Sequence, residues 1–282
     1  MNQRETNLTV MEQLECMLLN ERHPSYRCRD YLNSQSQHEV SATDRFKLCQ
    51  WAYSITSACS LDLSVACVAI LFFDRFLSSG NSRAQFALTS PPQFQLAFAT
   101  ALFLALKTHS GMNVELDFFS ENVCGDLYRK EDLVEMEMEM LKALSWKLCG
   151  PTTHDFIEYF IELSHIEDGS IRSSLITDSK IIAASAMMRY PELHMPSHIA
   201  LTSIVESIEQ LQDVTPVQKV LLIHGIASAI CDHEYYTNDA APQKDSITPR
   251  SFGAYADNIV SLASQVVGRS MNQYRRIFSP SA

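Results

Sequence analysis

Apolar residues recur along most of this chain at the three- and four-residue spacing of amphipathic helices. One face of residues 44–59 carries four of them, at Leu48, Trp51, Ala52 and Ile55. Residues 61–77 are apolar on nearly every side, which predicts a buried central helix that reaches the surface at Asp74 and Arg75. No stretch shows the sustained alternation of a half-buried strand. The pattern therefore predicts an all-α protein.

Local signals set the expected ends of the helices in the first half. Ser41 and Asp44 stand at the spacing of a capping box, and Pro91 suits the first turn of a helix. Near the N-terminus, an amphipathic helix is predicted from Leu8, Met11, Leu14 and Leu18. Five further helices are expected over residues 44–59, 61–77, 91–107, 115–123 and 130–146.

The second half repeats this helical character after Pro151 and Thr152. Helices are expected over residues 153–163, 170–188, 196–211, 215–231 and 248–275. The polar stretch 232–246, rich in Asn, Asp and Pro, predicts an exposed loop.

Charge and length narrow the class of partner. The chain of 282 residues has a net charge of −11 and contains no cluster of Lys and Arg large enough to form an extended basic face. A nucleic-acid binder needs a basic face to neutralise phosphates, so DNA or RNA is not expected as the main partner. The length allows two domains, each with its own core. The most apolar runs, 63–73 and 94–106, are shorter than the roughly 20 residues that span a bilayer, so no membrane partner is expected.

Candidate chemistry is sparse. The eight cysteines form no C-x-x-C pair, which favours small core residues over a zinc site or disulfides. His194 and His198 have helical spacing, but Pro196 between them makes a metal site unfavourable. Motifs of phosphate-binding loops, nucleophile elbows and zinc proteases are absent. We therefore expect no enzyme activity, no cofactor and no bound metal.

Three segments carry a family resemblance: FFDRFLS at 72–78, ALFLALK at 101–107 and YRKEDLVEMEMEMLKALSWKL at 128–148. With the following Pro151 and Thr152 they resemble the cyclin box, a five-helix module. Six positions match the family pattern in order and at similar separations, namely Arg45, Trp51, Asp74, Leu96, Lys107 and Glu137. Because correctly spaced charges rarely recur by chance, the match is specific.

The resemblance implies two tandem five-helix cyclin boxes after a short N-terminal helix. The expected divisions are a helix and linker over residues 1–40, a kinase-binding box over 41–150, a second box-like domain over 151–275 and a tail over 276–282. The second half shows little identity to the first.

The resemblance also implies roles for single residues. In relatives, the counterparts of Lys107 and Glu137 hold polar groups of a cyclin-dependent serine/threonine kinase. From spacing alone, the alternative stays open that Lys107 only ends a helix and Glu137 is solvated. Arg45 and Asp74 are expected to pair inside the box, and Leu96 to lie in the core.

Two departures from the family pattern stand out. Most cyclins follow the lysine with an aromatic residue and two glutamates, whereas this chain has Thr108, His109 and Ser110, which are expected in a solvated loop. A substrate-docking patch is expected to be weak. Leu48, Trp51 and Gln95 are kept there, while Asp44 and Lys47 replace apolar residues.

The implied function is that of a cyclin in cell-cycle control, D-type-like and active at the G1/S transition, in the nucleus and/or cytoplasm. Protein substrates or inhibitors are further expected partners. One alternative is a cyclin-fold scaffold that binds a protein without activating a kinase. A second, a tandem-box transcription factor on DNA, is disfavoured by the acidic pI of about 5.2.

Overall fold

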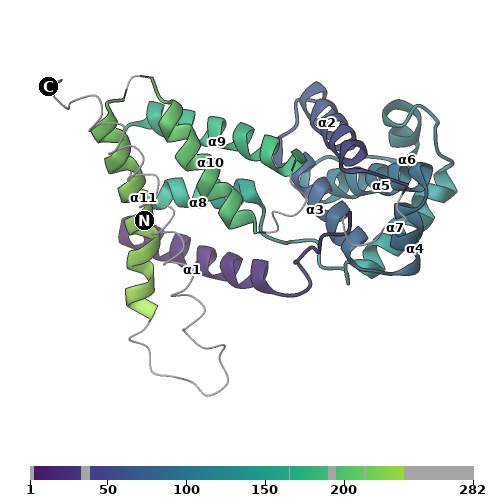
Figure 1. The fold of residues 1–282 in the computed structure, drawn as a ribbon, viewed down its shortest axis with the longest axis horizontal. Helices are drawn as coiled ribbons and strands as arrows, with labels where there is room; N and C mark the ends of the chain where they lie inside the picture. Colours follow the sequence, from purple (N-terminus) through teal and green to yellow (C-terminus); the bar gives the residue numbers. More distant parts are fainter. Residues whose placement is uncertain (1–2, 33–38, 165, 190–194, 213, 238–282) are drawn as a thin grey trace, which may run out of the picture. The chain divides into compact units, whose positions relative to one another are not determined.

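A computed structural model describes residues 3–32, 39–164, 166–189, 195–212 and 214–237 (Figure 1). Every regular element in these ranges is helical, which confirms the predicted all-α class. In the described ranges no helix combines the length and apolar character needed to cross a membrane. The predicted helix 248–275 and tail 276–282 lie outside the described residues, and so does most of the linker.

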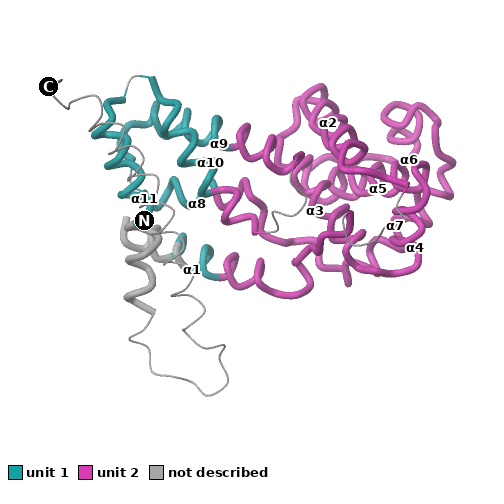
Figure 2. The backbone as a smooth tube through the Cα atoms, in the orientation of Figure 1, with its two compact units in different colours: residues 1–15, 157–179, 201–282 teal, residues 16–156, 180–200 magenta. Residues whose placement is uncertain are grey.

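The chain forms two compact units, shown in different colours in Figure 2. Unit 1 contains residues 1–15, 157–179 and 201–282, and unit 2 contains residues 16–156 and 180–200. The domain boundaries expected from the sequence, at 40, 150 and 275, stay predictions.

Unit 2 is built around α3 (Ser64–Ser78), which packs against helices on several sides. These neighbours are α2 (Ala42–Ala58), α4 (Ser82–Leu88), α5 (Pro91–His109) and α7 (Lys130–Ala143). Phe73 of α3 lies edge-on to Phe94 and Phe98 of α5, each with ring centroids 4.9 Å apart. The uniformly apolar sequence of α3 is thus explained, and its predicted central position is confirmed.

The capping box predicted at the start of α2 is present. Ser41 Oγ accepts a hydrogen bond from the Asp44 backbone N–H, and Asp44 Oδ2 accepts one from the Ser41 backbone N–H at 3.0 Å. The apolar face predicted for α2 is only partly buried, however. The fully buried residues are Arg45, Cys49, Ala52 and Thr56, whereas Leu48, Trp51 and Ile55 are half-buried. Two polar residues can occupy the core because their polar groups find partners there; Thr56 Oγ1, for example, donates to the Ala52 carbonyl at 3.1 Å.

Several helix ends differ from the predictions. Helix α4 was not predicted; it is seven residues long and begins with Asn81 Oδ1 accepting from the Ala84 N–H at 2.7 Å. Helix α7 ends at Ala143 rather than residue 146, because Ser145 and Trp146 adopt positive φ angles of 53° and 59°. The segment predicted over 115–123 forms the short α6 (Leu116–Phe118) and a π-helical turn, η1 (Phe119–Val123).

Unit 1 contains parts of four helices and α11 (Pro216–Thr237). The four are α1 (Gln3–Arg22), α8 (Thr153–Leu163), α9 (Gly169–Arg189) and α10 (Pro196–Gln210). Within this unit, Tyr159 of α8 donates to Gln13 Oε1 of α1 at 2.7 Å, and Leu14 is fully buried, as its helical spacing predicts. Helix α11 continues through residues 232–237, which corrects the loop predicted from residue 232 onward.

The cysteines only partly fulfil their predicted role. Cys49 and Cys67 are buried core residues of unit 2, whereas Cys16, Cys59 and Cys149 are exposed. The described cysteines are all free thiols. The described part of the chain also has no group of three or more His, Cys, Asp or Glu side chains that could hold a metal ion.

His154, in the first turn of α8, is a buried titratable residue of unit 2. Neither ring nitrogen has a hydrogen-bond partner among the described residues. Burial, reinforced by the positive charge of Lys180, lowers the pKa of His154 to about 4. The folded protein therefore holds a neutral imidazole at pH values where the unfolded chain takes up a proton.

We expect this difference to make folding pH-dependent. The neutral His154 should contribute fully to the free energy of unfolding above pH 6.5, the pKa of a histidine in the unfolded chain. As the pH falls toward about 4, the free energy of unfolding should decrease by up to about 3 kcal/mol. Urea unfolding of the wild type and His154→Leu across this range measures it, with His23→Leu as a control at an exposed histidine. The His154→Leu variant should lose less stability on acidification. Parallel pH profiles for the two proteins would contradict the assignment.

Candidate protein-binding surface

Lys107 and Glu137 come together at the surface of unit 2, although 30 residues separate them. Residues 96–106 of α5 are buried, and Lys107 is the first exposed position after them. The Lys107 Nζ lies 2.7 Å from Glu137 Oε1 on α7, and 4.9 Å from the centroid of the Phe103 ring. The ion pair therefore links the C-terminal end of α5 to the middle of α7.

Glu137 differs from the glutamates beside it. Its side chain is only 13% exposed, compared with 65% for Glu135 and 35% for Glu139. Glu139 pairs with Lys142 of its own helix, whereas Glu137 pairs with a residue of another helix. The side chain of Lys107 is 41% exposed, so the pair is accessible from its lysine side. This geometry disfavours the alternative in which Glu137 is simply solvated.

Apolar side chains flank this ion pair on α7. Val134 is 46% exposed and lies one helical turn before Glu137, and Met138 is 42% exposed and lies one turn after Val134. We call Lys107, Val134, Glu137 and Met138 the α5/α7 surface. Exposed apolar residues beside a partly buried charge pair are typical of protein-binding surfaces.

The residues after Lys107 do not form the loop that the sequence predicted. Thr108 and His109 complete the last turn of α5, and Ser110 is its C-terminal cap. Thr108 Oγ1 donates to the Leu104 carbonyl at 2.7 Å, and Ser110 Oγ donates to the Leu106 carbonyl at 2.6 Å. His109 packs against Phe72, with ring centroids 6.0 Å apart, and burial lowers its pKa. The hydroxyls of Thr108 and Ser110 thus satisfy carbonyls in the last turn of α5, and residues 108–110 carry no negative charge.

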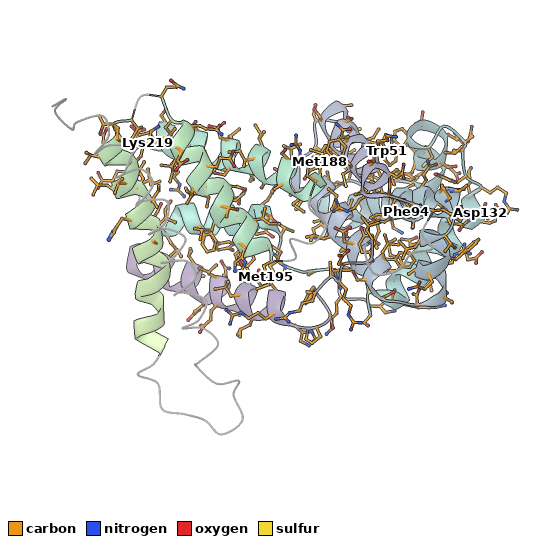
Figure 3. All side chains as sticks on the ribbon, viewed as in Figure 1. Trp51, Phe94, Asp132, Met188, Met195 and Lys219 are labelled. Atoms are coloured by element: carbon orange, nitrogen blue, oxygen red, sulfur yellow. The ribbon has the colours of Figure 1, made fainter. Side chains whose placement is uncertain are left out.

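Arg45 and Asp74 form a bidentate pair in the core of unit 2. Arg45 Nε donates to Asp74 Oδ1 at 2.9 Å, and Nη2 donates to Oδ2 at 2.7 Å. Tyr31 adds a hydrogen bond to Oδ1 at 2.6 Å. The remaining nitrogen of Arg45, Nη1, donates to the carbonyls of Met187 and Met188 at the end of α9, at 2.9 and 3.0 Å. Met188 is labelled in Figure 3. The pair is therefore structural, because every charged atom is occupied within the core.

Asp74 and Arg75 are not at the surface, which corrects a prediction. They are only 5% and 7% exposed, because the segment that follows α1 lies over this end of α3. Arg75 Nε donates to the Ser25 carbonyl at 3.0 Å, and its guanidinium lies 4.7 Å from the centroid of the Tyr26 ring. No local signal in the sequence shows that this distant segment covers the helix.

The three residues of the predicted substrate-docking patch, Leu48, Trp51 and Gln95, differ in their exposure. Trp51 is half-buried, with its ring centroid 6.4 Å from that of Phe98 (Figure 3). Leu48 is half-buried and Gln95 is exposed, whereas Leu96 lies in the core at 3% exposure. The weak docking patch stays a prediction.

A helical box with a buried charge network and a mixed apolar and charged surface defines a helical protein-binding module. Residues 12–149 match the family model for the cyclin N-terminal domain. The chain therefore carries a cyclin N-terminal domain over these residues.

Curated relatives agree with this assignment. The chain is 31% identical to putative cyclin-F2-1 of Oryza sativa subsp. japonica over 160 residues, which cover 51% of this chain and 40% of that protein. It is 26% identical to G1/S-specific cyclin-D1 of Homo sapiens over 195 residues, which cover 64% of this chain and 58% of that protein. The chain thus spans less than two thirds of the length of these relatives.

A solved structure shows the same fold. The viral cyclin from herpesvirus saimiri superposes with a TM-score of 0.61 at 17% sequence identity. The match covers 94% of this chain and 99% of the viral protein. The cyclin fold implied by the sequence motifs is therefore confirmed.

The Arg45–Asp74 pair generates a stability prediction. Asp74→Ala should lower the free energy of unfolding by about 3 to 5 kcal/mol, because it leaves the Arg45 guanidinium buried without its carboxylate. The double variant Arg45→Met/Asp74→Leu should be less destabilised than Asp74→Ala, because it removes both charges and keeps apolar volume. Urea unfolding midpoints at unchanged m-value measure both effects. A double variant destabilised as much as Asp74→Ala, or more, would contradict this prediction.

Proposed function

We propose that this chain is a regulatory cyclin that binds and activates a cyclin-dependent serine/threonine kinase in cell-cycle control. The observation that carries the proposal is the partly buried Lys107–Glu137 pair, which is accessible from its lysine side and belongs to the same surface as the exposed Val134 and Met138. The family membership of residues 12–149 supports it.

The chemistry of the pair suits a protein partner rather than a small molecule. Lys107 Nζ has three N–H donors, and Glu137 Oε1 accepts one of them, so the others can reach carbonyls of a partner. The Glu137 carboxylate has further lone pairs that can accept from amide N–H groups. Burial of Val134 and Met138 against the partner would exclude water and strengthen these bonds.

The finer parts of the function are also proposals. The altered docking patch and the dissimilar second half favour a D-type-like role at the G1/S transition, in the nucleus and/or cytoplasm. In this role the chain supplies a binding surface, and the kinase supplies ATP, magnesium and the catalytic groups.

The pair can be tested with one single variant and two matched double variants. Lys107→Ala leaves Glu137 unpaired in the contact and should weaken binding to a kinase by about 2 to 5 kcal/mol, which is roughly 30- to 4,000-fold in Kd. Lys107→Ala/Glu137→Ala should weaken binding as well, because it removes the donors and acceptors offered to the kinase. The control Glu139→Ala/Lys142→Ala removes another ion pair of α7, with a 2.8 Å contact, and should leave binding unchanged. A panel of purified cyclin-dependent kinases, assayed for binding and for activity on a proline-directed substrate, provides both measurements.

The outcomes separate this proposal from its alternative. Kinase activity that requires the wild-type pair supports a cyclin that activates its partner. Binding without activation would favour the scaffold. Equal binding by both double variants, with cooperative unfolding retained, would exclude the α5/α7 surface as the contact.

A further inference from the structure

A second surface feature of unit 2 lies apart from the α5/α7 surface and has a different chemistry. It is a polar pocket of about 190 Å³ beside the segment that follows α1. Its lining includes three arginines and three serines, namely Arg27, Arg29, Arg75, Ser25, Ser78 and Ser79. Such a concentration of cations is unexpected in a chain with a net charge of −11.

Arg75 is buried without a matching negative charge. Within the described ranges its side chain donates only to two backbone carbonyls, Ser25 O at 3.0 Å and Leu144 O at 3.5 Å. Among the described residues, no carboxylate oxygen lies within 4.0 Å of its nitrogens. A buried cation without a counter-ion is costly, so the site favours an added anion.

The neighbouring Asp74 cannot supply this charge. Its Oδ1 accepts from both Arg45 and Tyr31, and its Oδ2 accepts from Arg45. The two buried arginines of unit 2, Arg45 on α2 and Arg75 on α3, therefore differ in their partners. The Arg45 guanidinium is neutralised within the core, whereas the Arg75 guanidinium lines the pocket.

The mouth of the pocket adds further positive charge. Arg27 and Arg29 are exposed, and neither forms an ion pair with a described residue. Lys147 Nζ reaches Ser25 Oγ at 3.1 Å. Ser78 Oγ is held between the backbone N–H and carbonyl of Arg29, at 2.9 and 3.2 Å, which fixes the loop against α3.

We propose that this pocket binds the phosphate group of a phosphorylated serine or threonine in a partner peptide. Guanidinium groups match phosphate oxygens with paired N–H donors. The hydroxyls of Ser78 and Ser79 donate to backbone carbonyls, whereas Ser25 Oγ accepts from Lys147 and keeps its own O–H to donate. The pocket is smaller than the roughly 300–1,000 Å³ of sites for whole small molecules, so it suits one phosphate carried on a chain. The acidic remainder of the protein disfavours a long polyanion such as nucleic acid.

Fluorescence anisotropy with a labelled peptide of glycine and alanine that carries one phosphoserine provides the test. The phosphopeptide should bind the full chain, and its unphosphorylated twin should not. Arg27→Gln/Arg29→Gln changes exposed residues, so folding should be retained while the Kd rises about 10- to 100-fold. The control Arg129→Gln/Lys130→Gln removes two exposed positive charges elsewhere in unit 2 and should leave the Kd unchanged.

The variant Arg75→Lys tests separately whether the buried guanidinium contributes to phosphopeptide binding. It keeps the charge but loses the paired donors, so binding should weaken about tenfold with cooperative unfolding retained. If the Arg129→Gln/Lys130→Gln control weakened phosphopeptide binding equally, the effect would be due to net charge alone, and the proposal would be overturned. So would inorganic phosphate binding as tightly as the phosphopeptide, or no phosphopeptide binding at millimolar concentration.

Discussion

The buried guanidinium of Arg45 constrains more of unit 2 than any single apolar contact does. Two of its nitrogens donate to the Asp74 carboxylate of α3, and the third donates to the carbonyls of Met187 and Met188 at the end of α9. These two methionines are 142 and 143 residues from Arg45 in the sequence. Tyr31 reaches the same carboxylate from the segment before α2. A buried charge pair of this kind often adds little net stability, but any packing that displaces one of these segments leaves a charge unpaired. The network therefore acts mainly by penalising alternative arrangements of the helices.

The same network determines which charges remain for binding. Because Asp74 is fully used by Arg45 and Tyr31, the adjacent Arg75 has no carboxylate partner among the described residues. It contacts backbone carbonyls and the Tyr26 ring, and it lines a polar pocket. On another part of unit 2, Lys107 and Glu137 pair at the surface with donors and acceptors to spare. Three charged sites thus differ in how far their charges are satisfied within the chain. The most completely satisfied site is structural, and the two incompletely satisfied ones are those proposed to bind partners.

The sequence predicted the helices better than it predicted their faces. Helix α8 begins and ends where its periodicity and the preceding Thr152 indicate, and α3 is central as its apolar composition requires. The face of α2 was misplaced because apolar periodicity cannot show that Arg45 is buried with its donors satisfied. The short α4 lacks enough turns to display a period. Proximity of Lys107 and Glu137 came from the family register alone, and the burial of Arg75 depends on a distant segment that no local pattern reveals.

The end of α5 indicates what a partner of the α5/α7 surface must provide. The hydroxyls of Thr108 and Ser110 are directed to carbonyls of their own helix, and His109 packs on Phe72. This corner therefore offers a basic partner no carboxylate, in contrast to the two glutamates of most cyclins. In the proposed complex, recognition would then depend on polar backbone groups bound by Lys107 and Glu137 and on apolar contact with Val134 and Met138. Such contacts are shorter in range than ion pairs, so selectivity would come from shape complementarity and less from electrostatic attraction at a distance.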